Sequence, residues 1–288
     1  MIVTASDQHI AEAARILREG GLVAFPSETV YGLGADATNG RAVATIFEAK
    51  GRPRFNPLIV HIANLAAASD LAVFDNSSLS LAEKFWPGPL TLVLPRRPGV
   101  PISELVTAGL DTIAIRVPAH PVAQRLLEEA EIPIAAPSAN ISGRVSPTCA
   151  AHVEEDLGNR ISLILDGGST QAGVESTIIG MLPSPALLRA GAVAREDIER
   201  QLKCKLSDTH GSEISAPGQL VSHYAPRATL RLQAAEARPG EMLLAFGPNA
   251  PEGTMNLSRS GDLREAAANL FAYLRALDAL GSPQIAVM

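Results

Sequence analysis

The chain has 288 residues, of which 47% are hydrophobic and 19% charged, and its formal net charge is −6. This length and composition predict a globular protein with one large domain, or a large domain and a small one, and exclude a disordered chain. The acidic balance argues against a protein held on nucleic acid by a broad basic face, so no stable nucleic-acid binding is expected.

Cysteine usage and hydropathy place further limits on the chain. Cys149 and Cys204 form no metal or redox motif, and the six histidines have no ligand spacing, so no protein metal site is expected. The N-terminus lacks a signal pattern, and no apolar run reaches the roughly 18 residues that span a membrane. These features predict a cytoplasmic protein without membrane contact.

Hydrophobic periodicity predicts alternating helices and strands. A helix is expected at 6–21, capped by Ser6 or Asp7 and ended by Gly20, then a strand at 22–25 and a helix at 41–51. Further helices are expected around 79–85, 121–130, 148–157 and 195–202. Short apolar runs bounded by Pro, Gly or Asp predict buried strands at 57–62, 90–94, 112–117, 132–137, 161–166, 176–181 and 186–191. The mixture indicates an α/β domain with a mixed sheet that ends near Leu206.

The pattern breaks at residues 207–228, which are rich in Ser, Gly and Pro and suit a linker or lid. Strands at 228–233, 241–247 and 283–288 and a helix at 263–280 predict a second, small α/β unit. A unit of about 60 residues is marginal alone, so we expect it to lean on the first.

The segment Phe25–Gly40 contains Gly32-x-Gly34-x-x-Ala37, the spacing of a dinucleotide-binding loop. However, six residues separate the strand at 22–25 from Gly32, Pro26 interrupts the strand, and no acidic residue follows at the required place. The glycines are therefore expected to shape a tight turn after the strand. Ser27, Thr29 and Tyr31 are expected to project toward a pocket.

A basic cluster follows the helix at 41–51. Lys50, Arg52, Arg54 and Asn56 lie within seven residues. They suit a triphosphate, although cations at a helix C-terminus also complement the helix dipole. His61 alternates with apolar neighbours, which is compatible with a structural or a functional role.

Polar residues also interrupt several predicted strands. Arg116 lies in an apolar strand on the same face as Thr112, and a buried arginine needs an anionic partner: Glu28, Glu175 or a ligand carboxylate. Hydroxyl-rich loops, which form turns or bind anions, adjoin other strands at Ser138, Asn140, Ser142, Ser146, Thr148, Ser176 and Thr177, with Arg189 nearby. No serine has a histidine and an aspartate that the sequence identifies as its catalytic partners, so a hydrolytic triad is poorly supported.

These blocks, in their order and spacing, resemble the Sua5/YciO/YrdC family: PSETVYGLGADA, KGRPRFNPLIVHI, WPGPLTLVL, TAGLDTIAIRVPAHP, IAAPSANISGRVSPT, GVESTI and LLRAG. The resemblance covers essentially the whole chain, and APGQLVSHYAP followed by a small α/β unit is similar to the two-domain members. It implies an α/β fold with a YrdC-like twisted mixed sheet, flanking helices and a central cavity in residues 1–206. A linker or lid at 207–228 and a small Rossmann-like C-terminal Sua5 domain at 229–288 complete the implied organisation.

The resemblance implies a nucleotidyltransferase that makes L-threonylcarbamoyladenylate and pyrophosphate from L-threonine, bicarbonate or CO2, and ATP. The product would serve N6-threonylcarbamoyladenosine formation at position 37 of tRNA, through a downstream tRNA threonylcarbamoyltransferase complex. Mg²⁺ would be bound mainly through ATP phosphates and water.

Site residues follow from the same resemblance. It implies that L-threonine is bound by Thr29, His61, Arg116, Ser176 and the backbone of Ala136. It implies that ATP is bound by Arg52, Asn56, Thr112, Ser138, Ser146, Arg189 and Tyr224. Lys50 and Arg52 are the implied catalytic residues, facing the phosphates.

The chain departs from the family pattern in two places. Ser27 stands where members usually have threonine, which keeps the hydroxyl. The chain ends at QIAVM, where members usually continue, so a truncated small domain is expected. Two alternatives are a carbamoyl-transfer domain like that of hydrogenase maturation proteins, which share the YrdC fold, and an RNA-binding module using the Lys50–Arg54 patch.

Overall fold

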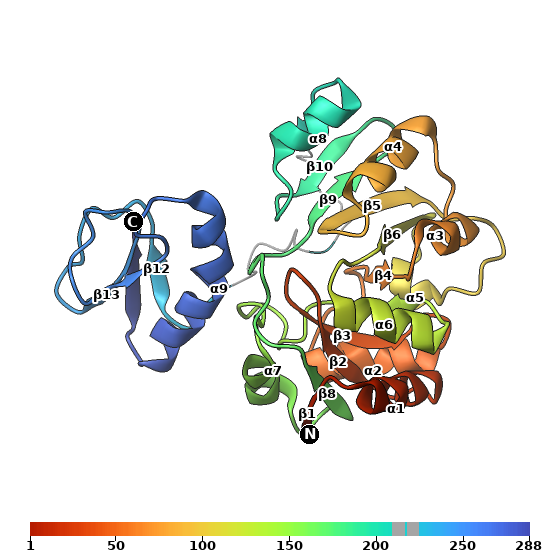
Figure 1. Ribbon diagram of the computed structural model, residues 1–288, viewed down its shortest axis with the longest axis horizontal. Helices are drawn as coiled ribbons and strands as arrows, with labels where there is room; N and C mark the ends of the chain where they lie inside the picture. Colours follow the sequence, from red (N-terminus) through yellow and green to blue (C-terminus); the bar gives the residue numbers. More distant parts are fainter. Residues whose placement is uncertain (209–216, 218–224) are drawn as a thin grey trace.

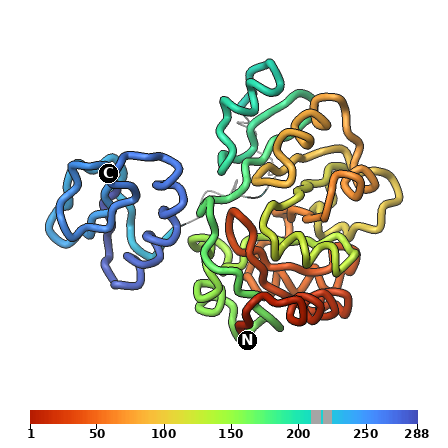
Figure 2. The backbone as a smooth tube through the Cα atoms, in the orientation of Figure 1, coloured from red at the N-terminus to blue at the C-terminus, as the bar shows by residue number. Residues whose placement is uncertain are grey.

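A computed structural model describes residues 1–208, 217 and 225–288. These residues form two sheets, one of 11 strands and one of four (Figures 1 and 2). Figure 1 shows the small C-terminal unit in blue beside the larger unit, which is coloured red to cyan. The boundaries expected at 206 and 229 remain predictions. Ser207 and Asp208, which the sequence assigns to the linker, form a strand paired with Ala186 and Leu187.

The large sheet has the strand order β1-β8-β2-β3-β7-β4-β6-β5-β9-β10-β11 and contains parallel and antiparallel pairs, as the sequence predicts. Its strands are β1 (Ile2–Thr4), β2 (Val23–Pro26), β3 (Tyr31–Asp36), β4 (Ile59–His61), β5 (Leu90–Pro95), β6 (Thr112–Arg116), β7 (Ile134–Ala135), β8 (Leu163–Asp166), β9 (Thr177–Gly180), β10 (Ala186–Arg189) and β11 (Ser207–Asp208).

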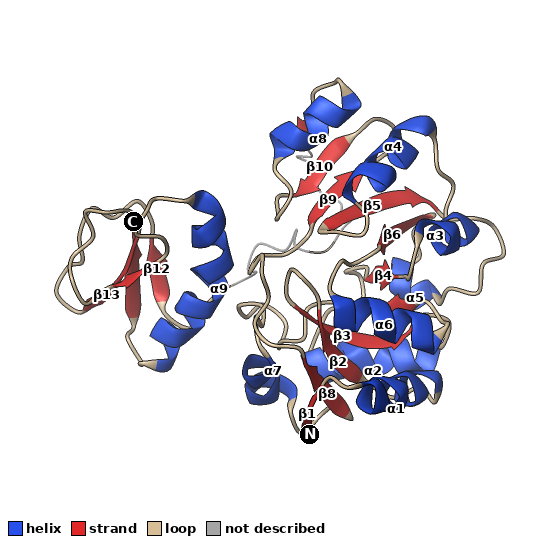
Figure 3. Ribbon diagram, in the orientation of Figure 1, coloured by secondary structure: helices blue, strands red, loops and turns tan. Residues whose placement is uncertain are grey.

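Helices flank this sheet, as Figure 3 shows. They are α1 (Asp7–Arg18), α2 (Gly40–Lys50), α3 (Leu65–Leu71), α4 (Asn76–Phe85), α5 (Glu104–Thr107), α6 (Pro121–Ala130), α7 (Ala150–Leu157) and α8 (Arg195–Leu202). Local sequence sets several of their ends. The Ser6 side chain accepts from His9 N and caps α1, and Gly51, with φ of 61°, ends α2 in the left-handed conformation.

Both faces of the sheet are buried, and strand alternation separates two apolar clusters. Val23 and Phe25 of β2 pack with Leu17 of α1 and Leu126 of α6. Ala24, between them in the chain, belongs instead to the larger cluster that contains residues of α2, α4 and α7. Because both faces are covered, the strands read as continuous apolar runs.

The small unit contains four parallel-paired strands and one long helix. Its sheet order is β12-β15-β13-β14. The elements are β12 (Thr229–Arg231), β13 (Glu241–Ala245), β14 (Met255–Asn256), α9 (Leu263–Ala279) and β15 (Gln284–Val287). Within the described ranges, no helix combines the length and apolar character needed to cross a membrane.

The prediction of a tight turn at Gly32 and Gly34 is wrong. Both glycines lie inside β3, which pairs antiparallel with β2 so that Gly32 faces Phe25. A Cβ added at Gly34 would lie 2.9 Å from Phe25 Cε1 and 3.0 Å from Ile134 Cγ2. The glycine therefore makes room for the Phe25 ring between neighbouring strands.

We predict that Gly34→Ala lowers the free energy of unfolding by about 1–3 kcal/mol, because the added methyl group overlaps a buried ring. Gly32→Ala is the matched control, since its Cβ would meet Ala136 and Phe25 at ordinary contact distances of 3.4 and 3.6 Å. Urea unfolding of both variants checks this. Equal losses would contradict the steric explanation.

Candidate active site

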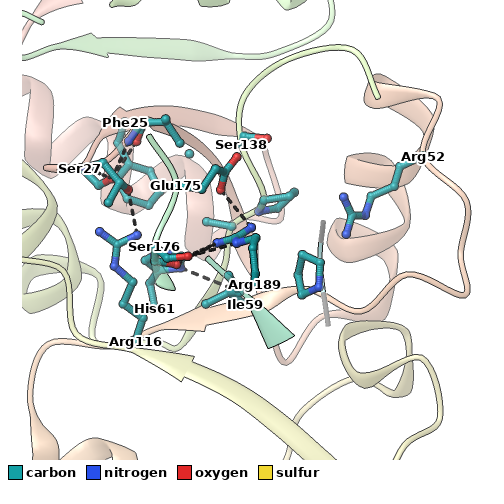
Figure 4. A pocket seen from close by; sticks show the side chains of 16 residues that line it. Phe25, Ser27, Arg52, Ile59, His61, Arg116, Ser138, Glu175, Ser176 and Arg189 are labelled. Atoms are coloured by element: carbon teal, nitrogen blue, oxygen red, sulfur yellow. Dashed lines mark hydrogen bonds and ion pairs between the residues drawn. The ribbon is translucent and has the colours of Figure 1, made fainter. Parts of the chain in front are cut away.

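A small pocket lies where several strands of the large sheet end (Figure 4). His61 ends β4 and Arg116 ends β6, and these two residues are register partners in parallel strands. The turn after β2, the chain after β7, the residues before β9 and the end of β10 complete the wall. The lining residues are Phe25, Ser27, Thr29, Val30, Gly32, Arg52, Ile59, His61, Arg116, Ala136, Pro137, Ser138, Glu175, Ser176, Arg189 and Pro217.

Arg116 is buried, and its partner among the predicted alternatives is Glu28. Nη2 lies 2.6 Å from Glu28 Oε1, Nη1 donates to Thr29 Oγ1 at 2.9 Å, and Nε donates to Gly88 O at 3.2 Å. Burial alone would raise the pKa of Glu28, but the charge and hydrogen bond of Arg116 hold it below its ordinary value. Since a guanidinium carries five N–H donors, Arg116 can still donate to a ligand carboxylate.

The turn between β2 and β3 presents two hydroxyl groups. Ser27 Oγ lies 2.8 Å from Thr29 Oγ1 and donates to Val30 O, while the backbone N–H of Thr29 donates to Ser27 Oγ. Both side chains line the pocket, as predicted. Tyr31 does not: its hydroxyl donates to Gly168 O at 2.7 Å.

His61 lies beside Arg116 in the pocket wall. Its ring packs edge-on to Phe25, with centroids 6.2 Å apart, and Nδ1 lies 3.3 Å from Ile59 O. Burial, and then the neighbouring Arg116 charge, lower the pKa of His61 to about 3. His61 is therefore a neutral hydrogen-bonding group at neutral pH.

A second polar network surrounds Arg189. Its Nη1 lies 3.2 Å from Glu175 Oε2, and its Nη2 donates to Ser176 Oγ at 2.9 Å. Ser146 Oγ donates to Glu175 Oε1 at 2.7 Å, and Ser176 Oγ lies 2.8 Å from Thr91 Oγ1. Glu175 thus joins Ser146, which does not itself line the pocket, to the pocket-lining Arg189.

The basic cluster is divided between two environments. Arg52 lines the pocket, with Nη2 donating to Pro57 O at 2.9 Å, and Figure 4 shows it apart from Arg116 and Arg189. Lys50 does not line the pocket. Its Nζ donates to Asn140 O at 2.6 Å and to Ser138 O, beneath the loop that carries Ser138. Burial, and then Arg52, lower the pKa of Lys50 to about 7.

Asn56 is fully buried four residues after Arg52. Among the residues that the structure describes, neither the oxygen nor the nitrogen of its side-chain amide has a hydrogen-bond partner. A buried amide without partners costs free energy. This cost is the kind that a ligand can remove by supplying a donor and an acceptor.

The remaining predicted residues have different outcomes. Thr112 begins β6, at the end opposite Arg116, and does not line the pocket. Tyr224 lies outside the described residues, as does most of the predicted lid. Ala136 and Ser138 line the pocket after β7, with Ala136 N donating to Ile59 O at 2.9 Å.

Sequence reasoning considered Glu175 only as a partner for Arg116 and did not assign it to the site. It also missed the pocket-lining Phe25, Ile59 and Pro217. Glu175 could have been found, because it directly precedes Ser176 and a buried acid requires a cation such as Arg189. Apolar wall residues carry no such signal, since they look like any core residue.

No group of three or more His, Cys, Asp or Glu side chains able to hold a metal occurs in the described ranges. Glu175 is the carboxylate in the pocket wall, and it is engaged with Arg189 and Ser146. Such a donor set fits Mg²⁺ that arrives on a nucleotide and is ligated by phosphate and water.

The fold and the pocket define a class: an α/β protein whose pocket, with buried arginines and hydroxyls at strand ends, is suited to small anionic substrates. Residues 15–191 match the Sua5/YciO/YrdC family model, described as "Telomere recombination". Residues 193–288 match the model described as "Threonylcarbamoyl-AMP synthase, C-terminal domain". The chain belongs to the Sua5/YciO/YrdC family, in its two-domain form.

Similar proteins agree with this membership. The threonylcarbamoyl-AMP synthase of Bacillus subtilis is 50% identical over 237 residues, which are 80% of this chain and 68% of that protein. The synthase of Pyrococcus abyssi is 44% identical over 93% of this chain and 85% of that protein. The crystal structure of P. abyssi Sua5 complexed with L-threonine has a TM-score of 0.90 and 41% identity, covering 100% of this chain and 92% of that one.

We predict that His61 makes stability fall in acid. Because the pKa of His61 is about 3 in the folded protein against 6.5 ordinarily, the unfolded chain binds a proton first as pH falls between those values. Folding stability therefore drops by up to about 1.4 kcal/mol per pH unit in this window. Denaturant unfolding from pH 7 to pH 4 should give His61→Gln a shallower decline than the parent. Parallel profiles would contradict the prediction.

Proposed function

We propose that this chain is an L-threonylcarbamoyladenylate synthase, which forms threonylcarbamoyl-AMP and pyrophosphate from L-threonine, bicarbonate or CO2, and ATP. The product serves N6-threonylcarbamoyladenosine formation at tRNA position 37, through a tRNA threonylcarbamoyltransferase complex. The observation that carries the proposal is the likeness over the whole chain to a synthase solved with L-threonine, combined with a pocket of matching chemistry.

L-Threonine binds on the Arg116 side of the pocket. Arg116 and the Thr29 hydroxyl hold its carboxylate, and Ser176 and the backbone of Ala136 complete the subsite. Glu28 keeps Arg116 oriented and partly neutralised, so the guanidinium is stable while buried. Neutral His61 donates or accepts a hydrogen bond without adding charge beside Arg116.

ATP binds on the side of Arg52 and Arg189. Their guanidinium groups suit phosphate oxygens, because a planar fork can donate two parallel hydrogen bonds. Ser138 and Ser146 add hydroxyl groups, and Asn56 adds an amide that has no partner among the described residues. Tyr224 belongs to the expected set, whereas Thr112, at the other end of β6, does not line this pocket. Lys50 serves this side by fixing the Ser138 loop through two backbone carbonyls.

The reaction proceeds in two steps. The neutral threonine amine attacks the carbon of CO2, loses a proton and becomes a carbamate. A carbamate oxygen then attacks the α-phosphorus of ATP while the bond to the bridging oxygen breaks, so pyrophosphate leaves with its electron pair. Arg52 and Arg189 contribute by positioning the phosphates and neutralising their charge rather than by covalent catalysis.

Mg²⁺ would be held mainly by ATP phosphate oxygens and water, where it would neutralise charge on the phosphates. Glu175 lines the pocket, and its hydrogen bond from Ser146 fixes its orientation. The Arg189 guanidinium, paired with Glu175, stays on the pocket wall.

We predict that Asn56→Leu separates binding from stability. Leucine keeps the number and branching of side-chain heavy atoms, so the variant should be as stable as the parent or more stable, while its affinity for an unreactive ATP analogue falls about tenfold. Thermal melting and calorimetric titration measure the two effects. The matched control is Asn140→Leu, which should lose stability because Asn140 Nδ2 donates to Ile141 O and Arg144 O. A destabilised Asn56→Leu would contradict the prediction.

The decisive experiment incubates the protein with ATP, Mg²⁺, bicarbonate and labelled L-threonine and measures pyrophosphate and labelled adenylate. We expect both products, and we expect Arg116→Ala to lose threonine binding while retaining ATP binding, because Arg116 is the threonine counter-ion. Equal loss of both ligands would indicate a structural role for Arg116. No product from the parent protein, together with tight RNA binding, would favour the RNA-binding alternative.

A further inference from the structure

The small unit contacts the larger one through three valines. Val30 and Val145 of the larger unit are buried in one apolar cluster with Leu274 and Leu277 of α9, and Val174 packs against that cluster. Figure 1 shows α9 on the side of the small unit that faces the larger one. These contacts agree with the expectation that the small unit packs against the larger unit.

Each of these valines is the direct chain neighbour of a polar residue in or beside the candidate site. Thr29 comes just before the first valine, and Ser146 and Glu175 come just after the other two. The Ser146 hydroxyl donates to Glu175 Oε1 at 2.7 Å, so two of the three segments are also joined to each other. The hydrophobic cluster therefore lies directly behind the pocket wall.

Arg275 of α9 adds a polar contact to the same place. Its Nε and Nη2 donate to Val145 O at 3.1 and 2.6 Å, and Nη2 also bonds to Asp156 of α7. The side chains of Arg275 and Asp156 are 10% and 1% exposed, so these charge-assisted bonds are shielded from water. The carbonyl that Arg275 holds belongs to the peptide that links Val145 to Ser146.

The third segment touches α9 through its backbone. Gly173 has φ of +65°, and a Cβ placed on it would lie 2.1 Å from Ala268 O of α9. Only a residue without a side chain allows this approach, and Glu175 follows two residues later. The backbone N–H of Ala172 donates to Glu28 O at 2.8 Å, which ties this segment to the turn after β2.

We propose that α9 positions the ATP side of the site and that Arg275 is the positioning residue. By holding Val145 O, Arg275 sets where Ser146 lies, and Ser146 in turn orients Glu175 and its partner Arg189. The identification of the ligand as ATP rests on the proposed function. The dependence of the Ser146 position on Arg275 rests on the structure alone. The threonine side is anchored by Arg116, whose side chain bonds to Glu28, Thr29 and Gly88 O rather than to Val145 or Ser146, and Ser176 links that side to the Arg189 network.

The test measures affinities of the full chain for an unreactive ATP analogue with Mg²⁺ and, separately, for L-threonine. Arg275→Met should weaken analogue binding about tenfold, the effect of losing a charge-assisted hydrogen bond, while threonine affinity changes less than about twofold. In the synthase assay, KM for ATP should rise more than kcat falls. Arg275→Lys should shift ATP affinity in the same direction by less, because it keeps the charge and one donor to Val145 O.

Arg231→Met is the matched control. Like Arg275, Arg231 bonds through Nη2 to a buried acid, but that acid is Glu241 in the same small unit, and Arg231 Nε donates to Glu241 as well. The Arg231→Met variant should have a lower melting temperature than the parent and an unchanged affinity for the ATP analogue. The proposal is overturned by unchanged ATP affinity in Arg275→Met, or by an equal loss in Arg231→Met. If Arg275→Met does not fold, an unchanged ATP affinity in Arg275→Lys overturns it. A parent protein that does not bind the ATP analogue would instead overturn the proposed function.

Discussion

Burial of guanidinium groups at one end of the large sheet is the constraint on which the site depends. A buried arginine is stable only when its N–H groups meet acceptors and its charge meets an anion. Arg116 achieves this with Glu28, Thr29 and Gly88 O, and Arg189 with Glu175 and Ser176. Arg116 joins the end of β6 to a turn 88 residues away in the chain, and Arg189 joins the end of β10 to the residues before its neighbour β9, so the pairs fix segments that enclose the pocket.

The two ion pairs also divide the pocket chemically. Around Arg116 the groups are hydroxyls and a neutral imidazole, which suit an amino-acid carboxylate. Around Arg189, Glu175 and Ser146 form one network, which suits phosphate and its associated cation, and Ser176, assigned to the threonine side, lies where the two subsites meet. The proposed reaction requires both kinds of subsite side by side, since a carbamate made from one substrate would have to reach the α-phosphorus of the other.

Lys50 and Asn56 show that the basic cluster supports the site in different ways. The Lys50 side chain donates hydrogen bonds to backbone carbonyls of the Ser138 loop, and its burial lowers its pKa to about 7. Asn56, in contrast, is buried with an amide that has no partner among the described residues. Lys50 therefore stabilises the loop that carries the pocket-lining Ser138, and Asn56 carries a polar group for which the described part of the fold supplies no partner.

Sequence alone determined the helices other than the short α3 and α5, most strands, the need of Arg116 for a buried anion and the family membership, because periodicity, capping residues and spaced motifs are local properties. It did not determine β3, since its two glycines look like a turn until Phe25 is known to lie across them. Only the tertiary structure decided which acid pairs with which arginine and that Lys50 lies beneath a loop. It also decided that α9 lies behind Ser146 and Glu175. These are contacts between residues far apart in the chain, and no local pattern records which surfaces the fold brings together.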